Sequence, residues 1–206
     1  MPKVSEKSAP YAVFEGEFNM APARDQHNEF VYEITAYFNQ HFKGKEFIAK
    51  FDTFRYLEDG LIHAFGDFKN AIGLERFIAG LKRFGASKNF IKQKLDEFAA
   101  AGTLPPGYAP DVLVVKKTER HNRFSIPLLT IEIVSESSRV NDLYFKPYFY
   151  ETLGVQEFFV GETQEEFGTI VRGYRMGKGQ YHPIVAEHSG YYSEVIGHVI
   201  PQAWEL

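Results

Sequence analysis

Three apolar segments set the architecture of this chain, and they read Pro110-Asp111-Val112-Leu113-Val114-Val115, Leu128-Leu129-Thr130-Ile131-Glu132-Ile133-Val134 and Gly154-Val155-Gln156-Glu157-Phe158-Phe159-Val160. Each segment is short and rich in β-branched or aromatic residues, which favours a strand over a helix. The Val-Leu-Val-Val run predicts a strand that is buried on both faces. Between the last two segments, Pro147 and Gly154 bound a predicted helix, because proline is tolerated where a helix begins and glycine commonly ends one. Strand, strand, helix, strand is the order of an α/β core.

Three charged residues lie in these segments or beside the predicted helix. Asp111 begins the first strand, Glu132 lies inside the second, and Lys146 directly precedes Pro147. A residue before proline is disfavoured in the α conformation, so we expect Lys146 at the mouth of the helix and outside its helical geometry. Two carboxylates and an ammonium on neighbouring elements are the groups that metal-assisted phosphodiester hydrolysis uses, since a hard cation needs oxygen ligands.

Each of the three residues also has a purely structural interpretation. Glu132 is flanked by apolar residues, where an ionised carboxylate is costly to bury without a partner, but it can instead lie on the solvent face of an alternating strand. Asp111 follows a proline and can be a turn or strand-end cap, and Lys146 taken alone can be a surface lysine. Their joint occurrence favours the functional interpretation.

Composition limits the class of protein. With 206 residues, 44% of them hydrophobic, the chain suffices for one well-buried domain that spans residues 1–206. The absence of cysteine excludes disulfides and thiolate metal sites and is consistent with a reducing cytoplasm. No segment is long and apolar enough to span a bilayer, so we expect a soluble, cytoplasmic protein without a membrane partner. The net charge of −4 argues against non-specific coating of nucleic acid, but it is compatible with a nuclease that has a local basic patch.

The rest of the chain predicts helices around the core. Apolar residues at helical spacing predict an amphipathic helix that ends near His41, and the pattern of residues 67–101 predicts two short helices divided near Gly85. We therefore expect a helical pair inserted at about residues 61–103. Its stretch from Lys69 to Lys94 is the most basic segment of the chain, with Glu75 as its one acid and the cations Lys69, Arg76, Lys82, Arg83, Lys88, Lys92 and Lys94. A solvated helix surface is the simpler explanation, and contact with a phosphate backbone is the more specific one.

Other candidate sites carry less information. The sequence has no Gly-x-Ser-x-Gly motif, no phosphate-binding glycine loop and no pair of histidines three or four residues apart. His27 can bind substrate or metal, or can be an ordinary histidine near a helix start. Glu17, on a hairpin or strand predicted at residues 11–20, can equally form a salt bridge. The two residues are secondary candidates.

The spacing of these motifs resembles the Uma2 family, also called DUF820, of the PD-(D/E)XK nuclease superfamily. The resemblance rests on the run at 110–115, on Glu132-Ile133-Val134-Ser135-Glu136-Ser137-Ser138-Arg139, Asp142-Leu143, Lys146, Tyr150 and Gly154-Val155-Gln156-Glu157-Phe158, and on residues near the N-terminus that include Tyr11, Glu17 and His27. It covers the chain except for about residues 59–107. It implies a restriction-endonuclease-like fold, with a mixed central sheet flanked by helices.

The resemblance also implies a site and an activity. Asp111 and Glu132 correspond to the paired metal-binding acids of the superfamily, with Glu17 or His27 contributed by the N-terminal part. The superfamily lysine usually stands two positions after the second acid, where this chain has Val134, and the lysine displaced to the following helix corresponds to Lys146. The implied function is an endodeoxyribonuclease in which these acids and the carbonyl of Ile133 hold Mg²⁺, or Mn²⁺ in its place.

Two other classes of function stay open. A nuclease fold without activity can bind DNA or a protein partner. Alternatively, the twenty phenylalanines and the helical pair can mainly build a homodimer.

Overall fold

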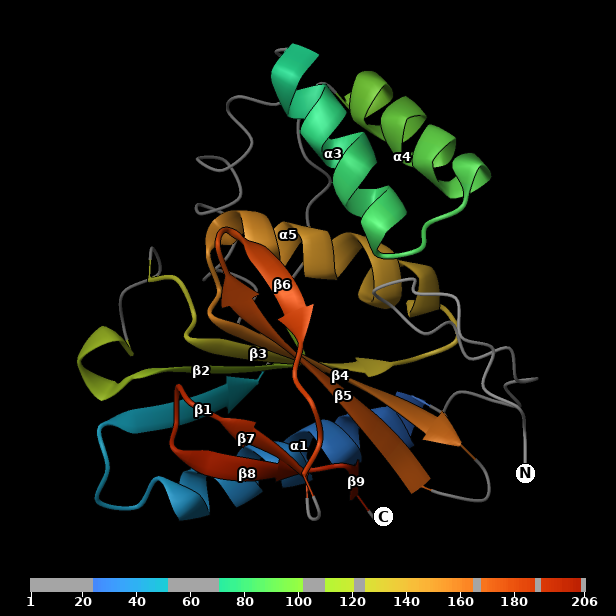
Figure 1. Cartoon of the computed structure of the whole chain (residues 1–206). Coiled ribbons are helices and arrows are strands. Elements are labelled where there is room, and N and C mark those ends of the chain that lie inside the picture. Colours follow the sequence, from blue (N-terminus) through green and yellow to red (C-terminus); the bar gives the residue numbers. More distant parts are fainter. Residues whose placement is uncertain are drawn as a thin grey trace.

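The computed structural model describes residues 24–51, 71–101, 110–120, 125–164, 168–187 and 190–204 (Figure 1). Glu17 and the hairpin predicted at residues 11–20 lie outside these residues. The division into one domain with a helical insertion at 61–103 stays a prediction.

The centre of the molecule is a mixed sheet in which six strands follow one another in the order β1-β2-β3-β4-β5-β6 (Figure 1). The strands are β1 Phe47–Phe51, β2 Val112–Lys116, β3 Leu129–Val134, β4 Glu157–Gln164, β5 Gly168–Gly177 and β6 Gln180–Pro183. A short strand, β9 Ala203–Trp204, also pairs with β5. Only the β3–β4 pair is parallel among the described strand pairs, and the predicted helix connects these two strands.

Helices cover both faces of this sheet. Helix α1 (Arg24–His41) lies on one face beside a two-stranded sheet formed by β7 Gly190–Ser193 and β8 His198–Pro201 (Figure 1). Helix α5 (Lys146–Leu153) covers the other face, and Gly154 ends it with a φ of 83° in the left-handed region. The mixed sheet and its flanking helices confirm the expected restriction-endonuclease-like α/β architecture.

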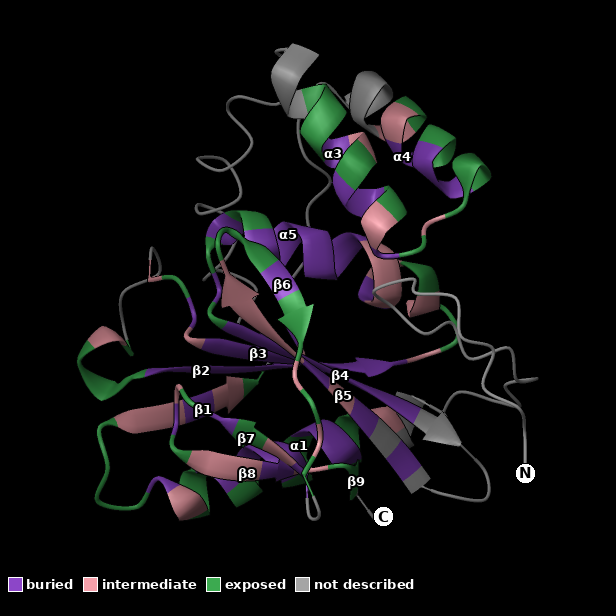
Figure 2. Ribbon diagram, in the orientation of Figure 1, coloured by how far each residue is buried: buried purple, intermediate pink, exposed green. Residues whose placement is uncertain are grey.

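The two faces have separate apolar cores. On the α1 face, side chains of β2, β3, β4 and β5 pack against the buried stripe of α1 that includes Phe30, Ile34 and Phe38, which confirms the predicted amphipathic helix. On the α5 face, aromatic side chains such as Phe149 and Phe158 predominate. Strands β2 and β3 are buried along nearly their whole length, as the apolar runs predict (Figure 2).

The helical pair predicted at residues 67–101 is present as α3 (Ala71–Arg83) and α4 (Lys88–Ala101). Phe77 of α3 makes edge contacts with the rings of Phe145 and Tyr148, so the pair packs onto the α5 side of the molecule. Not all of its cations are solvated. Lys94 is buried, with its Nζ 2.8 Å from Glu97 and 5.5 Å from the ring centroid of Phe145.

The prediction that Lys146 lies outside helical geometry is wrong. Lys146 has φ −60° and ψ −41°, and a π-helical turn, η3 (Asn141–Phe145), runs directly into α5. The N–H of Lys146 donates to the carbonyl of Asn141, five residues earlier. This wider turn gives room for Pro147, whose ring otherwise clashes with the carbonyl four residues before it.

Among the described residues, none of the helices is both long and apolar enough to cross a membrane.

Candidate active site

Asp111 stands immediately before β2 and is tied to β3. Its Oδ2 accepts the backbone N–H of Ile133 at 2.7 Å. The Nε2 of His27, on α1, lies 3.3 Å from the same Oδ2 and 3.1 Å from the carbonyl oxygen of Ile133. Because a carbonyl oxygen only accepts, Nε2 carries the proton in this arrangement. Asp111, His27 and the Ile133 carbonyl therefore meet where β2 begins and β3 ends.

Glu132, on β3, is fully buried. The alternative prediction, that it lies on the solvent face of an alternating strand, is therefore wrong. The Oε2 of Glu132 lies 2.7 Å from Nζ of Lys146, and its Oε1 accepts a hydrogen bond from the hydroxyl of Tyr150. Both carboxylate oxygens thus have partners supplied by α5.

Two further residues, Asp142 and Ser138, complete the surroundings of Lys146. Nζ of Lys146 forms an ion pair with Oδ1 of Asp142 at 2.8 Å, and the hydroxyl of Ser138 donates to Oδ2 of the same acid. The sequence interpretation gave no role to Ser138, Asp142 or Tyr150. These residues and Lys146 follow one another at intervals of four residues. This spacing could have indicated that they lie together, because positions i and i+4 of a helix share a face.

Burial is the largest influence on the pKa values of this cluster. It raises the pKa of Glu132 well above its ordinary value, and the charge of Lys146 offsets this only in part. Burial raises the pKa of Asp142 in the same way. Burial also acts to raise the pKa of Asp111, but the hydrogen bond from His27 and the charge of Lys146 outweigh it, so the pKa of Asp111 is lowered.

Lys146 remains a cation at neutral pH. Burial acts to lower its pKa, whereas the charges of Glu132, Asp142 and Asp111 act in the opposite direction and leave the pKa raised. When all three acids are ionised and His27 is neutral, one ammonium faces three carboxylates, so the cluster carries excess negative charge. A buried excess of this sign attracts a cation.

The donor atoms suit a hard divalent cation at one point of the cluster. Asp111 Oδ2 and the Ile133 carbonyl oxygen converge on a single N–H of His27, which marks a place where two oxygen ligands face the same position. In the part of the chain that the structure describes, no three His, Asp or Glu side chains are grouped as a complete metal site. The candidate ligands are therefore carboxylate and carbonyl oxygens, and Glu132 joins them only by exchanging one of its present partners.

The Uma2 family model, described as "Putative restriction endonuclease", matches residues 89–204. The chain belongs to the Uma2 family. The Uma2 match begins in α4 and includes Asp111, Glu132, Ile133 and Lys146, but it does not extend to His27. A nuclease-like function follows at the level of this family. No curated protein matches the chain.

The structure thus brings together four of the residues proposed from the sequence: His27, Asp111, Glu132 and Lys146. Glu17 lies outside the described residues.

Proposed function

We propose that the protein is a metal-dependent endodeoxyribonuclease that hydrolyses phosphodiester bonds at the cluster of Asp111, Glu132 and Lys146. The observation that supports this most strongly is the excess of carboxylates around one lysine, with Glu132 and Asp142 buried and Asp111 half-buried, at the edge where β2 begins and β3 ends. Membership of the Uma2 family supports the same reaction class.

Asp111, Glu132 and the carbonyl of Ile133 would hold Mg²⁺, with Mn²⁺ as a substitute. A bound divalent ion polarises the scissile phosphate and lowers the pKa of a coordinated water. The hydrogen bond from the Ile133 N–H fixes the orientation of the Asp111 carboxylate before any cation arrives. Such preorganisation avoids reorganisation during the reaction.

Lys146 would act through its charge. Its raised pKa makes it a poor proton acceptor at neutral pH, so it does not serve as the general base. Its ammonium would orient the attacking water and offset the negative charge that grows on the phosphate. Asp142 and Ser138 hold Lys146 in place for this task.

The test is cleavage of supercoiled, linear and single-stranded DNA with Mg²⁺ or Mn²⁺. Asp111→Asn, Glu132→Gln and Lys146→Met should each reduce the rate at least about 100-fold, since one electrostatic group of this kind commonly contributes about 3 to 4 kcal/mol. Glu29→Gln, an exposed acid on α1, is the matched control and should cut normally. Near-normal cleavage by a folded Asp111→Asn or Glu132→Gln variant would refute the assignment.

A non-cutting DNA- or protein-binding module is the second candidate, and one observation favours it. Both carboxylate oxygens of Glu132 already have partners, Lys146 and Tyr150, so the site as it stands is closed around its own lysine. On this hypothesis, the purified protein binds DNA or its partner but cuts no substrate with either metal, and Glu132→Gln leaves binding unchanged.

A further inference from the structure

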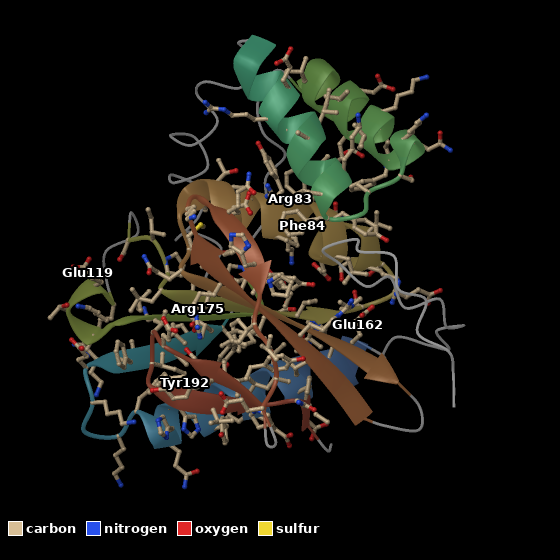
Figure 3. The ribbon with its side chains drawn as sticks, in the orientation of Figure 1. Arg83, Phe84, Glu119, Glu162, Arg175 and Tyr192 are labelled. Atoms are coloured by element: carbon tan, nitrogen blue, oxygen red, sulfur yellow. The ribbon has the colours of Figure 1, made fainter. Side chains whose placement is uncertain are left out.

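A second charged group lies on the same face of the sheet as Glu132. Glu162 of β4 is buried, and two arginines reach it from different elements: Nη2 of Arg139 lies 2.9 Å from Oε1, and Nη2 of Arg172 contacts Oε2. Figure 3 shows Glu162 near the end of β4 that is remote from Arg175. The arginine side chains keep 34% and 30% of their surface exposed, so both side chains are partly accessible to solvent.

The strand register places this group beside the candidate active site. Val160 of β4 pairs with Glu132 on one side and with Arg172 of β5 on the other, so the three residues form one row across the sheet. Paired residues of neighbouring strands project from the same face. Arg172 is therefore two strands from Glu132, roughly 10 Å at about 4.8 Å per strand.

Arg139 approaches from the other side of the cluster. It follows Ser138, whose hydroxyl holds Asp142, and Glu162 pairs in register with Val134 at the end of β3. Arg139 and the acid cluster thus share the segment that connects β3 to α5.

The two groups differ in their charged side chains. When its three acids are ionised and His27 is neutral, the acid cluster carries excess negative charge, which by itself repels a DNA strand. In the second group, two guanidinium ions contact one carboxylate. Guanidinium groups are planar forks of N–H donors that match phosphate oxygens, and a partly exposed pair can bind one without being removed from its carboxylate.

We propose that Arg139 and Arg172 form a phosphate-binding site for the DNA strand beside the cleaved bond, and that Glu162, the carboxylate they share, reduces the positive charge that this site presents. This inference rests on the proposed nuclease function. A separation of roughly 10 Å spans no more than a few nucleotides of one DNA strand, so the phosphate belongs to the same strand as the scissile one.

Binding of a short duplex, measured without divalent metal and over a range of salt concentrations, tests the proposal independently of cleavage. The double variant Arg139→Gln/Arg172→Gln should weaken binding at least about 10-fold and reduce the salt dependence by about one phosphate contact. Lys116→Gln/Arg120→Gln is the matched control, because it removes the same charge from exposed residues. These residues lie at or beyond the end of β2 that is remote from Asp111. This control variant should change the salt dependence much less.

Glu162→Gln separates a phosphate site from a purely structural ion group. Removing this carboxylate leaves both arginines and takes away a competing negative charge, so DNA binding should tighten about threefold or more. A structural group predicts weaker or unchanged binding for the same variant. Thermal melting verifies that each variant is folded, and Arg139→Lys, which keeps the charge, should retain most of the salt dependence.

The outcomes distinguish this inference from the nuclease proposal. If the protein never cuts DNA but binds it through the two arginines, the phosphate site stands and the nuclease proposal fails. If it cuts DNA while the double arginine variant keeps the wild-type affinity and salt dependence, the phosphate site is refuted and the nuclease proposal stands. Failure of the wild type to bind DNA at all also refutes the site.

Discussion

Two glutamates of this protein are fully buried on neighbouring parallel strands, yet their surroundings differ. Glu157 opens β4, and each of its oxygens meets a donor: Arg175 Nε at 2.8 Å and the Glu194 N–H at 3.0 Å reach Oε1, and the Ser193 hydroxyl reaches Oε2. Arg175 continues to Glu194 and to the carbonyl of Tyr192, and Figure 3 shows Arg175 and Tyr192 at the same end of the sheet. This group fastens the β7 strand to the central sheet.

Glu132 lies one strand away in a group that is not balanced. Its lysine is shared with Asp142 and influenced by Asp111, so three acids compete for one cation. Arg175 balances the buried Glu157, because the second acid that it contacts, Glu194, is exposed to solvent. Such a group is well explained by structure alone, whereas a buried excess of one sign is costly unless a ligand compensates it. Burial of a carboxylate is therefore a weak indication of function, and the balance of charges around it is a stronger indication.

The largest effect should come from breaking the balanced group. Glu157→Ala leaves Arg175, the Ser193 hydroxyl and the Glu194 N–H without their common acceptor. Removal of one partner from a buried pair costs about 3 to 5 kcal/mol, and we expect that loss of unfolding free energy in urea denaturation. Glu194→Ala, which deletes only the exposed partner of Arg175, should cost less than about 1 kcal/mol. Similar small losses for both variants would show that Glu157 does not hold the strands together.

Removing the charge of Glu132, in the unbalanced group, should instead stabilise the protein. Glu132→Gln should raise the free energy of unfolding at pH 7 by about 2 kcal/mol, because a neutral isostere removes a buried charge that the site compensates poorly. The sign follows from the pKa. A carboxyl whose pKa is raised in the folded state adds stability below its unfolded pKa, and this stability is lost as the pH rises through the folded value. The gain from Glu132→Gln should therefore shrink as the pH is lowered toward 4.5, and destabilisation at pH 7 would contradict the comparison.

Much of the fold could be predicted from the sequence, because its signals are local. The apolar runs of β2 and β3 and the glycine that ends α5 appear where the pattern places them. The helical geometry of Lys146 could not be predicted, since the rule for residues before proline holds for ordinary helices and not for a π-helical turn.

The site was only partly predictable for a different reason. Asp111, Glu132 and Lys146 stand out in apolar or proline-flanked positions, but nothing near Glu162 or Glu157 in the sequence identifies their arginine partners. Strand register brings Arg172 and Arg175 to these acids and depends on the whole sheet, and Arg139 reaches Glu162 from the segment between β3 and η3. The homodimer considered from the aromatic content stays a prediction.

A divalent cation should stabilise the unbalanced group and leave the balanced one unaffected. At a Mg²⁺ concentration of ten times Kd, binding to the folded state adds about 1.4 kcal/mol to the unfolding free energy. We expect this gain for the wild type and for Glu194→Ala, and its loss in Asp111→Asn. Thermal melting with Mg²⁺, compared with the same ionic strength of NaCl, measures it. An equal gain in Asp111→Asn would place the cation elsewhere.

The smallest effect concerns His27, whose hydrogen bond to Asp111 raises its pKa above 6.5. The stability contributed by protonated His27 is complete below pH 6.5 and is lost as the pH rises through the raised value. His27→Gln should therefore destabilise the protein more at pH 6 than at pH 9, by less than about 1 kcal/mol because the side chain is partly exposed. In an Asp111→Asn background this pH dependence should largely disappear, which urea denaturation at the two pH values can show.

The same hydrogen bond links His27 to the metal. Its N–H occupies the position shared by Asp111 Oδ2 and the Ile133 carbonyl, so protonated His27 competes with a cation for these two oxygens. Stabilisation by Mg²⁺ should then be weaker at pH 6 than at pH 8 in the wild type, and His27→Gln should reduce that difference. If Mg²⁺ stabilises both proteins with the same pH dependence, the cation does not share the position of the His27 N–H, and the unbalanced charge around Glu132 needs another ligand to explain it.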